Sequence, residues 1–291
     1  MPKSKINIDL VAHFFGSEPE RVFALPDLEL LFIEKFDDWN LPASMTAETF
    51  VSMLLTRTRL KQLRIRSRSH SSLLRYSWTG TPSPLSVALS IKKDDAYLSH
   101  GSAMWIHRLN ENDTDIFINK EQSPKPNNSN QLSHEAIHRA FQNQPRRSKR
   151  IYKYQDATIT LLNGKHTARL EVEPAKTPSG HNVQVTSLER TLIDITVRPV
   201  YSGGVSAVLR AFRAAKGRIS VSKLVALLHK LDYTYPYHQS IGFYFKWAGY
   251  SEADQLLARQ NGVKFDFYLC HALKDPAFDS DWRVFFPTNL K

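Results

Sequence analysis

Cysteine is almost absent from this chain of 291 residues, in which Cys270 is the single example. One thiol cannot form an internal disulfide, so the composition excludes the disulfide-stabilised scaffolds of small secreted proteins and favours a reducing, cytoplasmic setting. Long apolar runs are also missing, because no stretch reaches the ~18 apolar residues that indicate a membrane-spanning helix. The first residues, MPKSKINIDLVAHFF, contain no apolar block of signal-peptide length. We therefore expect a cytoplasmic protein with no membrane partner.

Several common enzyme signatures are missing as well. The chain contains no G-x-S-x-G nucleophile motif, no P-loop and no G-x-G-x-x-G turn. The acidic segment LEVEPAK resembles a nuclease strand, but Glu171 and Glu173 form Glu-x-Glu where such enzymes have Glu-x-Lys. From these absences we predict no enzymatic activity and no cofactor.

One segment is nevertheless typical of an enzyme. HEAIH matches H-E-x-x-H, in which two histidines on one helix face bind zinc and the glutamate activates a water molecule. The longer metzincin pattern needs glycine and histidine further on, where this chain has Phe141 and Gln144. We expect no metal, and the alternative interpretation is a zinc hydrolase or nuclease that uses His134, Glu135 and His138, completed by Glu171, Glu173 or His166.

Positive charge is abundant and unevenly distributed. The formal net charge is +11 and the pI is near 9.6, which is typical of proteins that bind polyanions such as nucleic acids. Smaller basic clusters occupy 146–150 and 210–218. The main cluster, 57–75, contains no acidic residue and these cationic ones: Arg57, Arg59, Lys61, Arg64, Arg66, Arg68 and Arg75.

Hydrophobic spacing predicts three helices followed by a hairpin. Apolar residues recur at helical spacing in 22–36 and form one side of 46–57, and 4–15 is interpreted as a short helix although its apolar period is poor. In LKQLRIRSR, Leu63 and Ile65 alternate with arginines, as on a strand with one buried and one basic face. LLRYSW can return as the partner strand after the turn SHSS. This order predicts a winged helix-turn-helix domain at 1–80.

Such a domain binds double-stranded DNA in a known way. The helix at 46–57 would enter the major groove, while the arginines of the strand would follow the phosphate backbone and supply affinity rather than sequence preference. The predicted DNA-binding residues are Ser44, Thr46, Thr49, Ser52, Arg57, Arg59, Lys61, Arg64, Arg66, Arg68 and Arg75. The alternatives are a solvated basic face on a domain that packs elsewhere, and an interaction module that binds RNA or an acidic protein.

The rest of the chain predicts a linker and a second domain. Proline and serine in GTPSPLSVALSIKKDDA indicate a linker at 81–95, and a low-complexity polar loop is expected at 121–133. We expect 96–291 to be a mixed α/β domain that ends in a helical bundle, so the predicted fold class is α+β. Strands are expected within 149–174, and helices at 96–109, 134–142, 187–197, 205–215, 221–231, 239–249 and 252–260.

The segment VTSLERTLIDITVRPVYSGG, 185–204, places charged residues beside a stripe of leucine and isoleucine. Thr186 as N-cap and Glu189 three residues later fit a capping box. Arg190 and Asp194 fit an i,i+4 ion pair, and the following Pro199 ends the helix. We therefore prefer a structural interpretation of these side chains to a catalytic one.

The same segment resembles the most recognisable motif of the AbiEi family, and AYLSHGSAMWIHRL resembles the helix that follows the DNA-binding domain in that family. Its members are antitoxins of type IV toxin–antitoxin systems, also described as transcriptional regulators of viral defence systems. The resemblance implies a winged-helix domain that represses its own operon and a C-terminal domain that counters a nucleotidyltransferase toxin without a stable complex. The motif positions in this chain are Glu189, Arg190, Thr191 and Asp194.

Two features depart from that family pattern, namely the polar loop at 121–133 and the acidic insertion EKFDDWN. The sequence also leaves the oligomeric state open, and a monomer that binds repeated sites cooperatively is one arrangement that it permits. An orphan regulator without a toxin is another.

Overall fold

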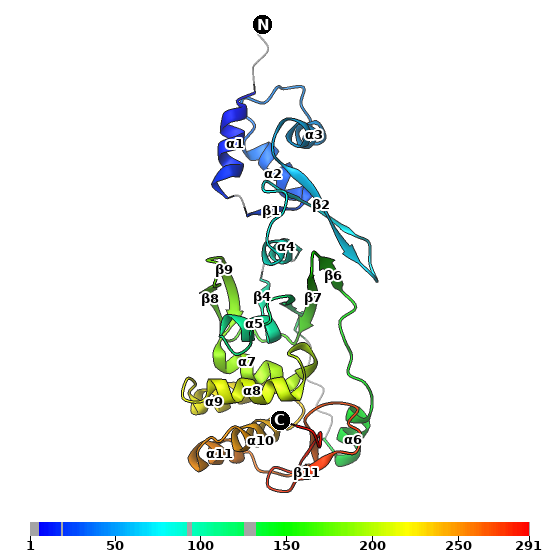
Figure 1. Cartoon of the computed structure of the whole chain (residues 1–291), viewed down its shortest axis with the longest axis vertical. Helices are drawn as coiled ribbons and strands as arrows, with labels where there is room; N and C mark the ends of the chain where they lie inside the picture. Colours follow the sequence, from blue (N-terminus) through cyan, green and yellow to red (C-terminus); the bar gives the residue numbers. More distant parts are fainter. Residues whose placement is uncertain (1–5, 19, 92–94, 125–131, 291) are drawn as a thin grey trace. The chain divides into compact units, whose positions relative to one another are not determined.

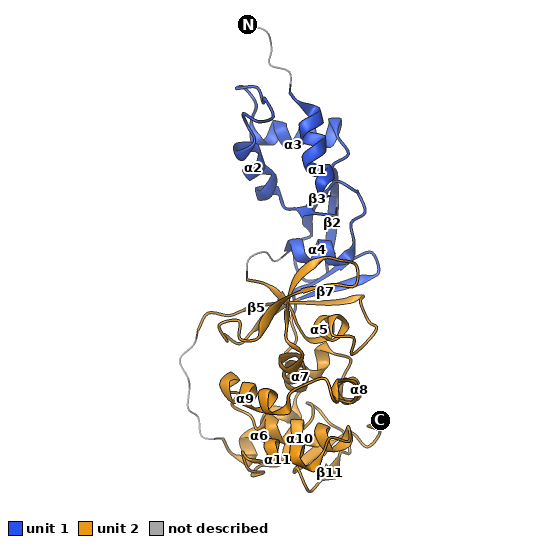
Figure 2. Cartoon of the chain, turned by 90° about the vertical axis from the view of Figure 1, so that its left-hand side faces the viewer, with its two compact units in different colours: residues 1–94, 149–160 blue, residues 95–148, 161–291 orange. Residues whose placement is uncertain are grey.

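The computed structural model describes residues 6–18, 20–91, 95–124 and 132–290. The chain divides into two compact units (Figure 2). Unit 1 comprises 1–94 and 149–160, and unit 2 comprises 95–148 and 161–291. Unit 1 therefore includes the segment 149–160, although this segment lies more than fifty positions beyond the predicted domain boundaries at 80 and 96.

The chain combines helices and sheet in one mixed α/β protein, as the sequence predicts. Within the described residues there are eleven α-helices, one large mixed sheet and one small sheet of three strands.

Unit 1 contains α1 (Ile8–Ser17), β1 (Val22–Phe23), α2 (Leu25–Glu34), α3 (Ala47–Arg57), β2 (Lys61–Ser67), β3 (Leu73–Ser77), α4 (Pro84–Ile91), β6 (Ile151–Tyr154) and the first half of β7 (Ala157–Gly164). Its strands are hydrogen-bonded in the order β1-β3-β2-β6-β7. The neighbouring pairs β1–β3, β3–β2, β2–β6 and β6–β7 are antiparallel.

Aromatic side chains fill the core between α1, α2 and α3. Phe15, Trp39 and Phe50 are buried, and the rings of Trp39 and Phe50 stack with centroids 5.8 Å apart. Thr46 is the N-cap of α3, because its hydroxyl accepts the Thr49 N–H, while the Thr49 hydroxyl accepts the Thr46 N–H. This reciprocal cap fixes the start of α3 at the position that the sequence indicates.

Two local predictions in unit 1 need correction. The segment 22–36 is not one helix, because Val22 and Phe23 pair with β3 and α2 begins only at Leu25. The segment 81–95, expected to be a linker, contains α4, in which Val87 and Ala88 are fully buried.

Unit 2 contains β4 (Tyr97–Leu98), α5 (His100–Ile106), β5 (Asp115–Glu121), α6 (His134–Gln142), the second half of β7, β8 (Val172–Lys176), β9 (Asn182–Thr186), α7 (Leu188–Val197), a 3₁₀ turn (Pro199–Tyr201), α8 (Val205–Ala215), α9 (Val221–Leu231), α10 (Tyr237–Trp247), α11 (Glu252–Arg259), β10 (Phe267–Tyr268), β11 (Ala277–Asp279) and β12 (Val284–Phe286). The larger set of strands has the order β7-β5-β4-β9-β8, in which β4 and β9 are parallel. The small sheet has the order β10-β12-β11.

Helix α7 lies at the centre of unit 2. Figure 1 shows the helices of this unit in successive layers beyond its strands, with α5 and α7 first, then α8 and α9, then α10 and α11. Helix α7 packs against α5, α8, α9 and α10, and every residue from Glu189 to Thr196 is buried. A charged side chain on this helix must therefore find its partners inside the protein.

The predicted helices of the C-terminal part are confirmed, since α7 to α11 begin and end within two residues of the expected ranges. The expected helix at 96–109 is wrong at its start. Leu98 pairs with Ile118 and Val185 in the sheet, so α5 begins only at His100, whose φ of 52° makes the turn from strand to helix. Of the expected polar loop, residues 125–131 lie outside the described residues.

Candidate functional site

The exposed face of β2 is basic, as the alternation in the sequence predicts. Arg64 and Arg66 are exposed, whereas Ile65 between them is fully buried. Arg68 follows the end of β2 in an exposed turn. The hydroxyl of Ser67 holds this turn in place, because it accepts the N–H groups of Ser69 and His70 and donates to the Ile151 carbonyl. Arg64 and Arg66 thus share the exposed face of β2, and Arg68 continues the alternate spacing into the turn.

Strand β6 extends this basic face with a residue that sequence analysis missed. Lys153 lies directly opposite Arg66 in the antiparallel pair, and its side chain is exposed. Opposite residues of an antiparallel pair project to the same face of the sheet. A like-charge pair in that position costs stability. The sequence places Lys153 in the strand-like segment KRIYKY, but it does not indicate which strand pairs with this segment.

Helix α3 presents a polar stripe to solvent. Thr49 and Ser52 are exposed, while Phe50, Val51 and Leu54 are buried in the core of unit 1. The hydroxyls of Thr46 and Thr49 are engaged in the helix cap. The predicted DNA-binding residues that the structure exposes are Ser44, Thr46, Thr49, Ser52, Arg57, Arg59, Lys61, Arg64, Arg66 and Arg68.

Arg75 differs from the other predicted DNA-binding residues. It lies on β3 opposite Leu63, on the covered face of the hairpin, and is half-buried. Its guanidinium donates to the carbonyls of Leu74 and Ser90, at 2.7 and 3.3 Å. Burial lowers the pKa of Arg75. We therefore assign Arg75 to the packing of α4 against the hairpin, not to the exposed basic face.

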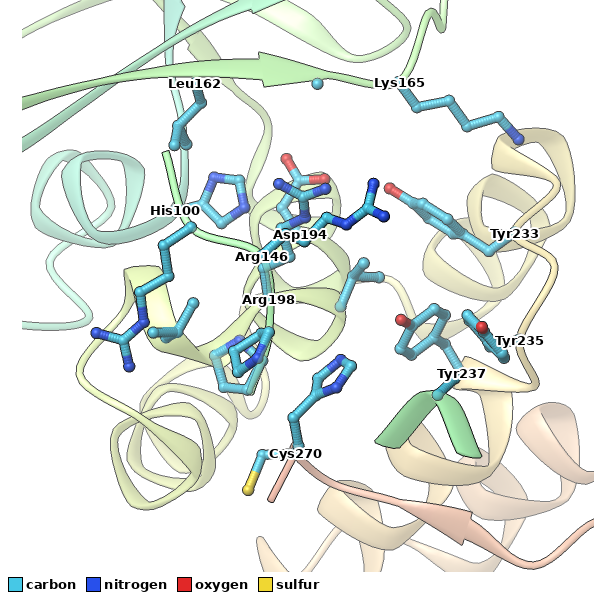
Figure 3. A pocket seen from close by; sticks show the side chains of 18 of the residues that line it. His100, Arg146, Leu162, Lys165, Asp194, Arg198, Tyr233, Tyr235, Tyr237 and Cys270 are labelled. Atoms are coloured by element: carbon cyan, nitrogen blue, oxygen red, sulfur yellow. The ribbon is translucent and has the colours of Figure 1, made fainter. Parts of the chain in front are cut away.

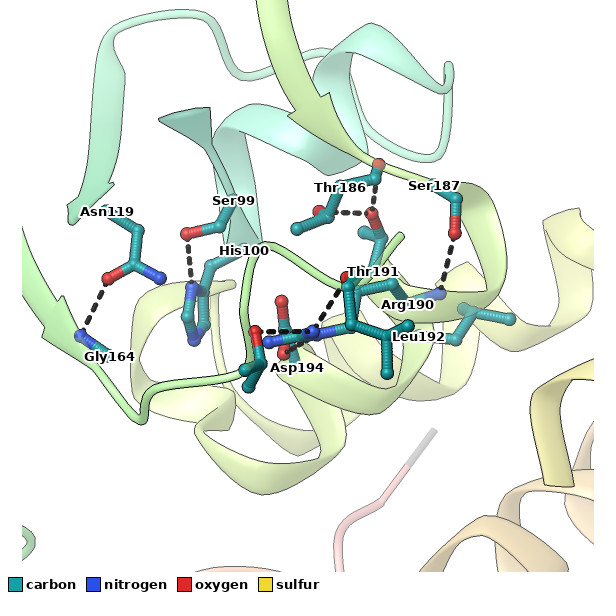
Figure 4. Close-up of polar contacts among 12 residues, drawn as sticks. Ser99, His100, Asn119, Gly164, Thr186, Ser187, Arg190, Thr191, Leu192 and Asp194 are labelled. Atoms are coloured by element: carbon teal, nitrogen blue, oxygen red, sulfur yellow. Dashed lines mark hydrogen bonds and ion pairs between the residues drawn. The ribbon is translucent and has the colours of Figure 1, made fainter. Parts of the chain in front are cut away.

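Helix α7 carries a buried ion pair. Arg190 Nε lies 2.9 Å from Asp194 Oδ1, and the two side chains are 3% and 6% exposed. Figure 4 shows this pair between the helix and the strand ends. The Arg190 guanidinium also donates to the Leu170 carbonyl, at 2.9 Å, and to the Thr167 hydroxyl, at 3.4 Å. Burial acts to lower the pKa of Arg190, but the attraction and hydrogen bond of Asp194 outweigh it, and the pKa is raised.

The predicted capping box at the start of α7 is wrong. Thr186 is the last residue of β9, and the N-cap is Ser187, whose hydroxyl accepts the Arg190 N–H. Glu189 turns away from its own helix and accepts the Ser220 N–H at 3.0 Å, at the N-terminus of α9. Lys223 on α9 lies 3.5 Å from the same carboxylate. Glu189 therefore joins two helices, which no pattern within residues 185–204 could reveal.

Thr191, the remaining position of the family motif, is fully buried. Its hydroxyl pairs with the Thr186 hydroxyl at 2.8 Å and with the Thr186 carbonyl at 3.1 Å (Figure 4). The four motif positions thus connect α7 to β9, to α9 and to the segment before β8. This arrangement agrees with the structural interpretation of the motif.

A cavity of about 990 Å³ opens beside Arg190 and Asp194 within unit 2. Its walls come from the end of α7, the start of α5, the end of β7, the segment between α9 and α10, and the residues after α6 and β10. Figure 3 shows three tyrosines on the side of the cavity opposite His100. Its charged lining residues are Arg139, Arg146, Arg147, Lys165, Arg190, Arg198 and Asp194. Sequence analysis did not predict this site, because its walls are far apart in the chain.

His100 is a buried histidine that lines this cavity. Its Nδ1 lies 2.8 Å from the Ser99 hydroxyl, and the side chain is 7% exposed. Burial lowers the pKa of His100 to about 4; the Asp194 carboxylate opposes this change, while Arg198 and Arg190 add to it. The imidazole is therefore neutral in the folded protein at pH 7.

The buried neutral imidazole predicts a loss of stability in acid. The pKa of His100 falls from 6.5 in the unfolded chain to about 4 in the folded protein. Protonation of His100 therefore leaves the free energy of unfolding unchanged above pH 6.5. As the pH falls from 6.5 toward 4, the free energy of unfolding decreases by up to about 3 kcal/mol, because only the unfolded chain binds the proton in that window. Replacement of His100 by glutamine is expected to flatten this part of the stability profile, as measured by urea unfolding at a series of pH values. Replacement of the exposed His13 by glutamine is the control, and equal slopes for both variants would contradict the prediction.

The HEAIH segment does form the start of a helix, α6, as predicted. His134 Nδ1 accepts the Asp266 N–H, and His138 Nδ1 lies 2.7 Å from the Tyr268 hydroxyl. The suggested third ligands lie elsewhere in unit 2, with Glu171 paired to Lys223 and His166 beside Glu121. Across the described ranges, no group of three or more histidine, cysteine, aspartate or glutamate side chains could hold a metal ion.

The fold of this chain is similar to that of a protein of known structure. The crystal structure of RV2827C protein from Mycobacterium tuberculosis superposes with a TM-score of 0.57, over 98% of this chain and 94% of that one, at 12% sequence identity. No family model matches the sequence, and no curated protein matches it. In the part of the chain that the structure describes, no helix is long and apolar enough to cross a membrane.

Proposed function

We propose that the protein is a cytoplasmic double-stranded-DNA-binding repressor, with unit 1 as a winged helix-turn-helix domain. The observation that carries the proposal is the exposed basic face of β2 and β6, where Arg64, Arg66 and Lys153 lie on one side of the sheet, with Arg68 exposed in the turn that follows β2. The order of α2, α3, β2 and β3, with β1 added to the hairpin, supports it. In this arrangement α3 enters the major groove and the hairpin follows the phosphates.

We also propose that the protein is an antitoxin of the AbiEi type, and this proposal rests on fewer observations. The motif at 185–204 resembles that family, and its four polar residues are buried and bonded around α7. By this resemblance the protein represses its own operon and acts as the antitoxin of a type IV system, against a nucleotidyltransferase-like toxin, without a stable complex. Neither enzymatic activity nor a cofactor forms part of the proposal.

The first test is binding of the purified full chain to the DNA upstream of its own gene, titrated with salt. We expect tight, sequence-dependent binding whose logarithm falls steeply with the logarithm of salt concentration. A scrambled duplex of equal length and a duplex RNA are the controls. Equal and weak binding to the DNA duplexes would contradict the repressor, and preference for RNA would instead support an RNA-binding module.

A further inference from the structure

The cavity beside α7 has a strong excess of positive charge. Six cationic side chains line it against one carboxylate, Asp194, which is already paired with Arg190. Arg146, Arg147 and Arg198 are exposed, and none of them has a salt-bridge partner among the described residues. Guanidinium groups that line a concave site are suited to bind phosphate, because their planar donors match its oxygens.

A second observation concerns the deep end of the cavity. Asp194 lines it, the Oδ2 atom of this residue is buried, and no described residue forms a hydrogen bond to that atom. A buried carboxylate oxygen without a donor costs free energy, so such atoms indicate a place where a ligand or water supplies one. The site therefore combines an acceptor at depth with anion-binding groups near its opening.

Aromatic rings form the third component. Tyr233, Tyr235 and Tyr237 line the cavity; the ring centroid of Tyr237 lies 5.5 Å from that of Tyr233 and 6.3 Å from that of Tyr235. They lie together on one side of it in Figure 3. Aromatic side chains provide stacking surfaces for nucleobases. The volume of about 990 Å³ is at the upper end of the range for pockets that hold small ligands.

We propose that this cavity binds a nucleotide, with its phosphates on Arg146, Arg147 and Arg198. In this arrangement a sugar hydroxyl or base amino group donates to Asp194 Oδ2, and the base lies against the tyrosines. The site is distinct from the DNA-binding face, which lies in unit 1. Nucleotide binding to unit 2 would give the proposed DNA-binding protein a second ligand, bound at a separate site.

The test is isothermal titration calorimetry of the full chain with ATP, GTP, CTP and UTP, at about 0.15 M salt to screen weak surface contacts. We expect saturable binding of at least one nucleotide and a loss of at least about tenfold in affinity for Arg198→Ala and for the Arg146→Ala, Arg147→Ala double variant, since each removes a charge-assisted hydrogen bond. These side chains are exposed, so the variants are expected to fold.

Three controls distinguish nucleotide binding in the cavity from nonspecific charge effects, from binding at the face of unit 1 and from binding of phosphate alone. The Arg210→Ala, Arg213→Ala double variant removes exposed charge of the same unit outside the cavity and should bind as the parent does. The Arg64→Ala, Arg66→Ala, Arg68→Ala variant should also keep its nucleotide affinity, because it alters the DNA-binding face alone. Tripolyphosphate that binds as tightly as the nucleotides would overturn the assignment of base and sugar contacts. Absence of saturable nucleotide binding, or equal affinity in parent and cavity variants, would overturn the site.

Discussion

Replacement of Arg64, Arg66 and Arg68 by alanine together is expected to weaken binding to every DNA duplex, by at least about a hundredfold at low salt. In the proposed complex each substitution would remove a charge-assisted hydrogen bond to phosphate, and such bonds contribute about 1.5 kcal/mol or more. The plot of log K against log salt should also become less steep, by about 0.9 for each phosphate that the variant no longer neutralises. The preference for one sequence over another should change little, because phosphate contacts carry no base information.

The measurement is fluorescence anisotropy with the proposed operator and a scrambled duplex, each at several salt concentrations. A variant that removes three exposed cations from unit 2, Arg210→Ala, Arg213→Ala and Lys230→Ala, changes the net charge equally and is the control. If both variants weaken binding to the same degree, the net charge alone determines affinity. If the hairpin variant binds as the parent does, the basic face of β2 does not contact DNA.

Local periodicity explains which parts of the structure can be predicted from the sequence. Helix α3 and strand β2 follow from the spacing of Phe50, Leu54, Leu63 and Ile65, because each pattern depends only on which side of the element meets the core. The same holds for the ion pair of Arg190 with Asp194, whose partners lie four residues apart on one helix. Interactions of this kind are contained in a short window of the sequence.

Most of the features that sequence analysis missed depend on contacts between distant segments, whereas α4, within the expected linker, is a local helix that the proline and serine content concealed. Glu189 caps α9 rather than α7. Its partner, the Ser220 N–H, lies 31 positions further along the chain and is outside any local capping pattern. Lys153 joins the basic face only through the pairing of β6 with β2. Tyr97 and Leu98 enter a sheet rather than a helix because β5 and β9 supply their hydrogen bonds. No spacing rule within one element contains that information, so the capping pattern at 186–189 indicates the wrong helix.

Separation of Arg190 from Asp194 should cause the largest loss of stability in unit 2. In Asp194→Leu, the Arg190 guanidinium remains buried with only the Leu170 carbonyl and Thr167 hydroxyl as partners. Removal of one partner of a buried ion pair costs about 3–5 kcal/mol. Urea unfolding of the full chain should therefore show an earlier transition for unit 2. Glu18→Ala is the control, because it breaks an exposed pair with Arg21, at 3.0 Å, whose contribution is at most about 1 kcal/mol.

The double variant Arg190→Met, Asp194→Leu decides between a structural and a functional role of the motif. If the pair serves the fold, the double variant should be more stable than either single variant, since it buries no unpaired charge. It should also retain DNA binding, because the basic face lies in unit 1. Additive destabilisation would mean that the two side chains do not act as a pair. Full stability of Asp194→Leu combined with loss of protection against a cognate toxin would assign the carboxylate to antitoxin action instead, and the buried oxygen Oδ2 would then be the atom to examine first.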